Sequence, residues 1–177
     1  MFLYGKDGEQ LISRPKEIYD GAYPSANSQT VMNLLRLSAI TGNLSYSEKA
    51  HEILNAFGAV INGHPSGCCH SLSSVLYTSG SSREVTVIGM EEDRELQSMK
   101  NVLFTVYDPF MVYAVCSDQD EKEKLEVLIP RLGERKMVNG KATAYVCANF
   151  ACREPVATAH ELEQQLGGSK LFYANKE

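Results

Sequence analysis

Two cysteines near the C-terminal end of the chain are the side chains best suited to covalent chemistry. Cys147 and Cys152 are separated by four residues, and Arg153 follows directly. A neighbouring guanidinium lowers the pKa of a thiol, and the thiolate is the form that attacks disulfides. The C-x4-C spacing is not the C-x-x-C of dithiol oxidoreductases, so it favours structural roles and leaves redox work as the second interpretation. Because Cys147 should end a strand and Cys152 should lie in a loop, we predict two unbridged thiols.

A polar and aromatic segment, residues 14–28, is the second place where chemistry is indicated. Four of its side chains fall next to the start of a helix: Asp20, Tyr23, Ser25 and Asn27. Loops of this composition form the rims of binding pockets, and we take these four residues as candidate ligand contacts. A capped and well-anchored helix start explains the same composition, and the sequence does not separate the two interpretations.

Metal and nucleotide sites are not indicated. Cys68, Cys69 and His70 are adjacent, but neighbouring cysteines rarely ligate one tetrahedral ion, and no second ligand pair at zinc spacing accompanies them. The chain has neither a G-x-G-x-x-G motif nor a P-loop, and three consecutive acids at residues 91–93 follow the first expected strand. Acids suit the start of a helix, where the dipole favours negative charge. We therefore expect neither a metal nor a cofactor.

The overall charge and composition limit the partners. The 177 residues carry 17 basic and 22 acidic side chains, a net charge of −5. This balance argues against a nucleic-acid partner, because basic surfaces bind the phosphate backbone. Apolar runs stay shorter than the roughly 18–20 residues that cross a bilayer, so we expect no membrane partner. Five cysteines, an odd number without disulfide-scaffold spacing, favour a reducing, cytoplasmic setting.

The elements that position the N-terminal polar segment are helices. Apolar residues at helical spacing predict three of them, joined by short turns as in a helical hairpin: residues 28–41, 45–62 and 69–77. Gly42 marks the end of the first, and Ser45 with Glu48 forms a capping pair at the start of the second. In the third helix we expect three side chains to point inward: Leu72, Val75 and Leu76.

The periodicity changes after residue 82, where strands and helices alternate. Three short apolar strands are expected at residues 84–89, 111–116 and 143–147. Charged helices follow them at residues 91–103, 120–129 and 158–166. This alternation predicts a small three-stranded parallel sheet built from βαβ units. We expect a helical region over residues 1–82, an α/β unit over 83–168 and a loose tail over 169–177, hence a mixed α/β fold.

Two sequence signatures together resemble a known family. The first joins residues 14–17 and 20–28 to the helix that carries residues 34–37, and the second joins residues 140–152 to Pro155-Val156 and Glu161-Leu162. Their order and distance resemble the C-terminal end of the bacterial YyaL-like proteins, relatives of the spermatogenesis-associated thioredoxin-domain proteins. Ala26 stands where that family usually has glycine, which questions any need for positive φ at this position.

The resemblance implies that this chain is the C-terminal part of a larger protein. Family members carry a thioredoxin-like domain and then an (α/α) toroid related to sugar epimerases and six-hairpin glycosidases. The first hypothesis is therefore a toroid that binds or processes a carbohydrate, with residues 14–28 on its rim, Asp20 as a polar contact, and Ser25 and Asn27 orienting a hydroxylated ligand. The rivals are a thiol-redox partner that uses Cys147 and Cys152 with the absent domain, and a purely structural or interaction module.

The same resemblance makes the absent regions the expected partners of this chain. By itself the chain should show no sugar turnover, because catalysis needs positioned partner groups. Helices built to pack against missing neighbours should expose apolar surface or drive self-association. This surface should expose some of the following side chains: Val31, Leu34, Leu35, Ile53, Leu54 and Phe57.

Overall fold

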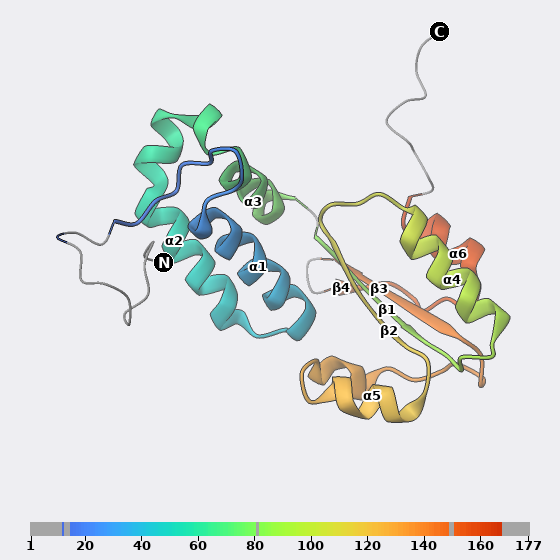
Figure 1. The fold of residues 1–177 in the computed structure, drawn as a ribbon. Helices are drawn as coiled ribbons and strands as arrows, with labels where there is room; N and C mark the ends of the chain where they lie inside the picture. Colours follow the sequence, from blue (N-terminus) through green and yellow to red (C-terminus); the bar gives the residue numbers. More distant parts are fainter. Residues whose placement is uncertain (1–11, 13–14, 81, 149–150, 168–177) are drawn as a thin grey trace, which may run out of the picture. The chain divides into compact units, whose positions relative to one another are not determined.

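A computed structural model describes residues 12, 15–80, 82–148 and 151–167 (Figure 1). The chain divides into two units, Met1–Ala39 with Asn43–Gly80, and Ile40–Gly42 with Ser81–Glu177. No helix among these described residues has both the length and the apolar character needed to cross a bilayer. The first unit is helical and the second is built on a sheet.

The helical unit holds three α-helices, as the apolar spacing predicts: α1 (Ala26–Thr41), α2 (Leu44–Gly63) and α3 (Cys69–Ser79), with the short 3-10 turn η1 (Pro65–Gly67) before α3. Gly42 follows α1 with a φ of 75°, the left-handed backbone that suits a glycine stop. The cap of α2 differs from the prediction. Asn43, and not Ser45, caps the helix by accepting a hydrogen bond from the Ser45 backbone N–H.

The six apolar side chains expected to contribute to an exposed surface are partly or fully covered. Val31 and Leu35 are buried, and the other four are half-buried: Leu34, Ile53, Leu54 and Phe57. The inward face predicted for α3 is right for Leu72, which packs against the core, and wrong for Val75 and Leu76, which are exposed. Ser71 and Ser74 are buried, while Leu76 is 60% exposed. Small serines allow close packing, and the Ser74 hydroxyl donates to the His70 carbonyl within the helix, which limits the cost of burying it.

The second unit contains a mixed four-stranded sheet in the order β2-β1-β3-β4. The strands are β1 (Arg83–Ile88), β2 (Met111–Cys116), β3 (Thr143–Ala148) and the two-residue β4 (Ala151–Cys152). The parallel pairing of β1 with β2 places Val87 opposite Val115, as predicted. The prediction of an all-parallel, three-stranded sheet is wrong, because β3 runs antiparallel to β1 and β4 adds a fourth strand.

The connection after β2 explains the reversed direction of β3. The chain leaves β2 at Cys116 and passes through the eight-residue helix α5 (Gln119–Glu126) and the 3-10 helix η2 (Pro130–Glu134). It starts β3 at Thr143, opposite Ile88 and therefore at the same end of the sheet. A crossover helix must carry the chain back along the full strand, and here the chain turns around instead. Asn139 and Gly140, with φ values of 54° and 70°, complete the return in a tight turn.

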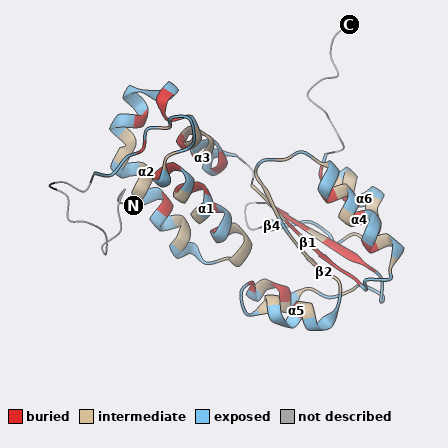
Figure 2. Cartoon of the chain, in the orientation of Figure 1, coloured by how far each residue is buried: buried red, intermediate tan, exposed pale blue. Residues whose placement is uncertain are grey.

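Helices cover both faces of the sheet (Figure 1). On one face, α4 (Arg94–Thr105) and α6 (Ala159–Gln165) pack on β1 and β3, and the predicted stripe of α4 is buried: Leu96, Met99 and Leu103. On the other face, α5 and η2 cover Ile88 and Cys116 through Ile129 and Leu132. Most of β1 is buried or half-buried between these layers, as Figure 2 shows. Arg135, the residue that directly follows η2, contacts both candidate cysteines.

Candidate functional site

The strand β4 folds back on β3 and brings the two candidate cysteines together. Cys147 lies directly opposite Cys152, and a disulfide joins them, so the prediction of two unbridged thiols is wrong. The backbone N–H of Arg153 donates to the Val146 carbonyl at 2.9 Å, which makes the cysteines a non-hydrogen-bonded pair. Opposed side chains lie closest in such pairs. With two residues between the strands, positions i and i+5 become opposite, and the C-x4-C spacing fits this geometry.

The guanidinium of Arg135 contacts both sulfur atoms. Its Nη2 lies 3.2 Å from the Sγ of Cys147 and 3.0 Å from the Sγ of Cys152. The sequence pointed to Arg153 for this role, but the Arg153 side chain donates to the carbonyl of Gln165 at 2.7 Å. The cation beside the sulfurs is therefore twelve residues from Cys147 in the chain, where no local motif marks it.

Neighbouring groups fix the position of Arg135. It follows η2, and its backbone N–H donates to the Leu132 carbonyl. Its guanidinium lies over the ring of Tyr145, 4.6 Å from the ring centre, a cation–π contact. The Tyr145 hydroxyl donates to the carbonyl of Lys136 at 2.6 Å and accepts from the Lys136 N–H at 3.2 Å. The ring is therefore tied to the same stretch of backbone that carries Arg135.

A carboxylate and a second guanidinium complete the site. Glu84 of β1 lies opposite Cys147 of β3 and forms an ion pair with Arg131 of η2. Burial raises the pKa of Glu84, while Arg131 and then Arg135 act to lower it. Two guanidinium groups thus accompany one carboxylate beside the disulfide. This surplus of positive charge favours an anion at the sulfur atoms.

The remaining cysteines are free thiols outside this site. Cys68 and Cys116 are buried and Cys69 is exposed. Burial raises the pKa of Cys68, and the Asp20 carboxylate raises it further. Burial also raises the pKa of Cys116, and Glu121 adds to the effect. Both buried thiols are therefore poor nucleophiles at neutral pH.

In the helical unit, Asp20 links two helix starts. Its Oδ1 accepts from the Ser25 N–H at 2.8 Å and from the Ser28 hydroxyl at 2.7 Å, and its Oδ2 accepts from the His70 N–H at 2.9 Å. Burial acts to raise the pKa of Asp20, but the hydrogen bonds from Ser25, Ser28 and His70 together lower it. The carboxylate therefore joins the start of α1 to the start of α3.

Ser25 and Asn27 make their contacts within the same segment. The Ser25 hydroxyl accepts from the Ser28 N–H at 3.1 Å, which makes Ser25 the cap of α1. The buried Asn27 side chain donates to the Glu17 carbonyl at 2.7 Å. Of the four candidate ligand residues, Ser25 caps α1 and Asn27 ties Glu17 to the first turn of α1.

Asp20 and Tyr23 line an open pocket of about 320 Å³ at the start of α3. The other lining residues are Gly21, Ala22, Pro24, Cys69, His70 and Ser73. The Tyr23 side chain is 81% exposed. The Nε2 atom of His70 is buried and has no hydrogen-bond partner among the described residues. An exposed aromatic ring in the lining of a pocket is a feature that can hold a small ligand.

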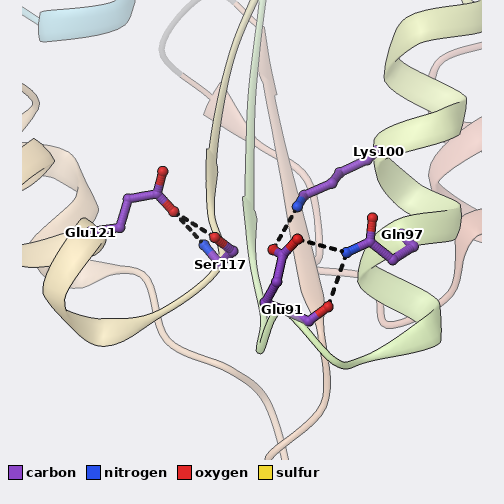
Figure 3. Close-up of polar contacts among 5 residues, drawn as sticks. All are labelled: Glu91, Gln97, Lys100, Ser117 and Glu121. Carbon is purple, nitrogen blue, oxygen red and sulfur yellow. Dashed lines mark hydrogen bonds and ion pairs between the residues drawn. The ribbon is translucent and has the colours of Figure 1, made fainter.

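The carboxyl ends of β1 and β2 are occupied by internal contacts (Figure 3). Glu91 accepts from Lys100 Nζ at 2.8 Å and from Gln97, while Ser117 donates to Glu121 through its backbone N–H and its hydroxyl. Side-chain caps follow both strands, at Asp93 for α4 and at Asp118 for α5. This confirms the structural interpretation of the acidic helix starts. The described residues contain no group of three or more His, Cys, Asp or Glu side chains placed to hold a metal ion.

Comparison with known proteins identifies relatives of this chain. Human spermatogenesis-associated protein 20 is 30% identical over 159 residues, which are 90% of this chain and 20% of the human protein. The rat protein of the same name is 28% identical over the same shares. This chain is homologous to part of spermatogenesis-associated protein 20. It spans about a fifth of the length of the curated relatives it matches. No family model matches the sequence, and no solved structure matches it.

Proposed function

We propose that Cys147 and Cys152 are a reversible redox pair within a longer protein. The disulfide opens and closes by exchange with an external dithiol–disulfide couple, whose dithiol form supplies two electrons and two protons and whose disulfide form accepts them. The contact of Arg135 with both sulfur atoms carries this proposal. A guanidinium keeps its charge at every accessible pH, so it stabilises whichever sulfur becomes a thiolate.

Arg135 also affects the equilibrium between the two forms. A group that stabilises the thiolate stabilises the reduced pair, and this makes the disulfide easier to reduce. A purely structural disulfide resists reduction, with a potential below roughly −300 mV. The exposed position of Cys152 gives an external thiol access to the bond.

A redox titration of the folded chain tests the proposal. In a Cys69→Ser variant, which lacks the exposed thiol outside the pair, the chain is equilibrated with defined ratios of reduced and oxidised dithiothreitol. Free thiols are then alkylated and counted by mass spectrometry. We expect two thiols to appear on reduction and to disappear on reoxidation, at a midpoint above roughly −300 mV. A bridge that opens only when the chain is unfolded would count for a structural disulfide.

A second candidate function rests on the pocket at the start of α3. We propose that Tyr23 binds one face of a hydroxylated ligand, such as a sugar, in this pocket. The exposed Tyr23 ring in the lining of this pocket favours this function. An aromatic face covers the apolar side of a sugar ring.

The rest of such a site would belong to the longer protein. In this proposal an (α/α) toroid and a thioredoxin-like domain lie in the four fifths of the relatives' length outside the match. Saturation-transfer NMR with simple sugars tests the pocket in this chain. We expect weak signals that are lost in Tyr23→Ala and retained in a control change at the exposed Tyr107, which belongs to the other unit. Equal signals from both variants would remove the pocket as the site.

A further inference from the structure

We propose that exchange at the pair has a fixed direction, in which Cys152 takes the external thiol and Cys147 is the leaving sulfur. This inference rests on the proposed redox function and adds the order of the steps. It also assigns Arg135 as the group that stabilises the leaving thiolate. The unequal exposure of the two sulfurs supports the direction, and the contacts of Arg135 support its role beside the leaving thiolate.

The two sulfurs differ in their access to solvent. Cys147 lies within β3, between β1 and β4, and is 4% exposed. Cys152 lies on the two-residue strand β4, which is an edge strand of the sheet. Cys152 and its neighbour Ala151 are both exposed. Thiol–disulfide exchange depends on which sulfur the incoming thiolate can reach. An external thiolate therefore attacks the Sγ of Cys152.

The reduction then proceeds in two balanced steps. The external thiolate forms a bond to the Cys152 sulfur, the Cys147–Cys152 bond breaks, and Cys147 leaves as a thiolate. The second thiolate of the external dithiol then attacks the dithiol's first sulfur, which is bonded to Cys152 in the mixed disulfide, and releases the Cys152 thiolate. The external dithiol becomes a disulfide, and its two protons pass to the two cysteines. Oxidation of the pair follows the same steps in reverse.

Arg135 favours the departure of Cys147 as an anion. Arg135 Nη2 lies 3.2 Å from the Cys147 sulfur and keeps its position through the Tyr145 ring. Glu84 lies opposite Cys147 in the sheet, and its negative charge is paired with Arg131. A leaving thiol of lower pKa departs faster. The Cys147 thiolate therefore has a cation beside it when it leaves. Because the same Nη2 lies 3.0 Å from the Cys152 sulfur, the direction of exchange follows from the unequal exposure of the two sulfurs.

Two single-cysteine forms of the pair test the direction, both in the Cys69→Ser background. In the Cys147→Ser variant only Cys152 remains, and in the Cys152→Ser variant only Cys147 remains. We expect Cys152 to react with the aromatic disulfide DTNB roughly ten times faster than Cys147, because it is exposed. In the bridged protein, a brief pulse of glutathione should leave the mixed disulfide on Cys152 in peptide mass spectra. Equal rates, or a mixed disulfide on Cys147, would overturn the direction.

The role of Arg135 has its own readout. In the Cys152→Ser variant, the thiolate absorbance of Cys147 near 240 nm is followed against pH. We expect Arg135→Ala to raise the pKa of Cys147 by about one unit or more, and Arg135→Lys to restore part of the shift. Arg153→Ala is the matched control, because its guanidinium binds a carbonyl and not a sulfur. An unchanged titration in Arg135→Ala would remove this role.

These results separate the inference from the function on which it rests. If the native bridge opens and re-forms reversibly but both sulfurs react alike, the redox pair stands and the direction is wrong. If the native bridge does not open, the redox function itself is wrong.

Discussion

Replacement of Asp20 is the sharpest test of how the helical unit is held together. The carboxylate accepts three hydrogen bonds, from the backbone N–H groups of Ser25 and His70 and from the Ser28 hydroxyl. In Asp20→Ala the Ser28 hydroxyl keeps a second acceptor, the Ser25 carbonyl at 2.9 Å. The two backbone N–H groups lose their partner. Hydrogen bonds to charged groups contribute about 1.5–3 kcal/mol each.

The expected loss is smaller than the sum of these contributions. Asp20 is half-buried, so water replaces part of each bond, and we expect the local stability of the unit to fall by about 2–3 kcal/mol. Since 1.4 kcal/mol corresponds to a factor of ten, the amide protons of Ser25 and His70 should exchange roughly 30 to 150 times faster. Hydrogen exchange followed by NMR measures both amides directly.

Asp20→Asn is the matched control for this experiment. An amide oxygen in the Oδ1 position still accepts from Ser25 and Ser28, while the amide nitrogen faces the His70 N–H and cannot accept from it. The increase in the exchange rate should then be largest at the His70 amide. Unchanged protection of both amides in Asp20→Ala would refute the assignment of Asp20 as the link between α1 and α3.

Three further predictions concern stability. The pKa of Asp20 is lowered on folding. Its contribution to stability should therefore be full above about pH 5 and lost as the pH falls through the folded-state pKa. Urea unfolding measured against pH should show this loss in the native chain and not in Asp20→Asn. Leu162→Ala, in the fully buried core of the sheet unit, should cost about 2–5 kcal/mol, whereas Leu128→Ala at a 66% exposed position should change the free energy of unfolding little. Gly140→Ala should cost about 1 kcal/mol in thermal unfolding, because its φ is 70°.

Local patterns in the sequence predicted the helices and the first two strands well. The stripe of Leu96, Met99 and Leu103 is buried as its spacing requires. The Thr158–Glu161 pair caps α6 through a hydrogen bond to the threonine hydroxyl. Such features depend on residues within one or two helical turns of one another, so the local sequence is enough to predict them.

The direction of β3 and the disulfide were missed because each depends on how the chain turns. The Asn139-Gly140 pair is a strong signal for a tight turn and could have indicated that β3 returns antiparallel. The C-x4-C spacing could have indicated a hairpin with a two-residue connection. When each element is considered separately, the alternation of strands and helices favours a parallel sheet more strongly than either of these signals favours an antiparallel return.

Arg135 left no signal in the sequence. It meets the sulfurs only because η2 ends beside β3, and Tyr145 then holds its guanidinium. Arg153, the nearest arginine in the chain, points to the end of α6 instead. The redox site therefore depends on tertiary packing between elements, which residue spacing does not encode.

The midpoint potential of the Cys147–Cys152 pair with and without Arg135 tests the central claim most directly. If Arg135 stabilises the reduced pair, Arg135→Ala should shift the midpoint by roughly 30 mV to a more negative value, the equivalent of about 1.4 kcal/mol for two electrons. Arg153→Ala should leave the midpoint unchanged. Equal midpoints in the native chain and both variants, or a bridge that never opens in the folded protein, would contradict the account.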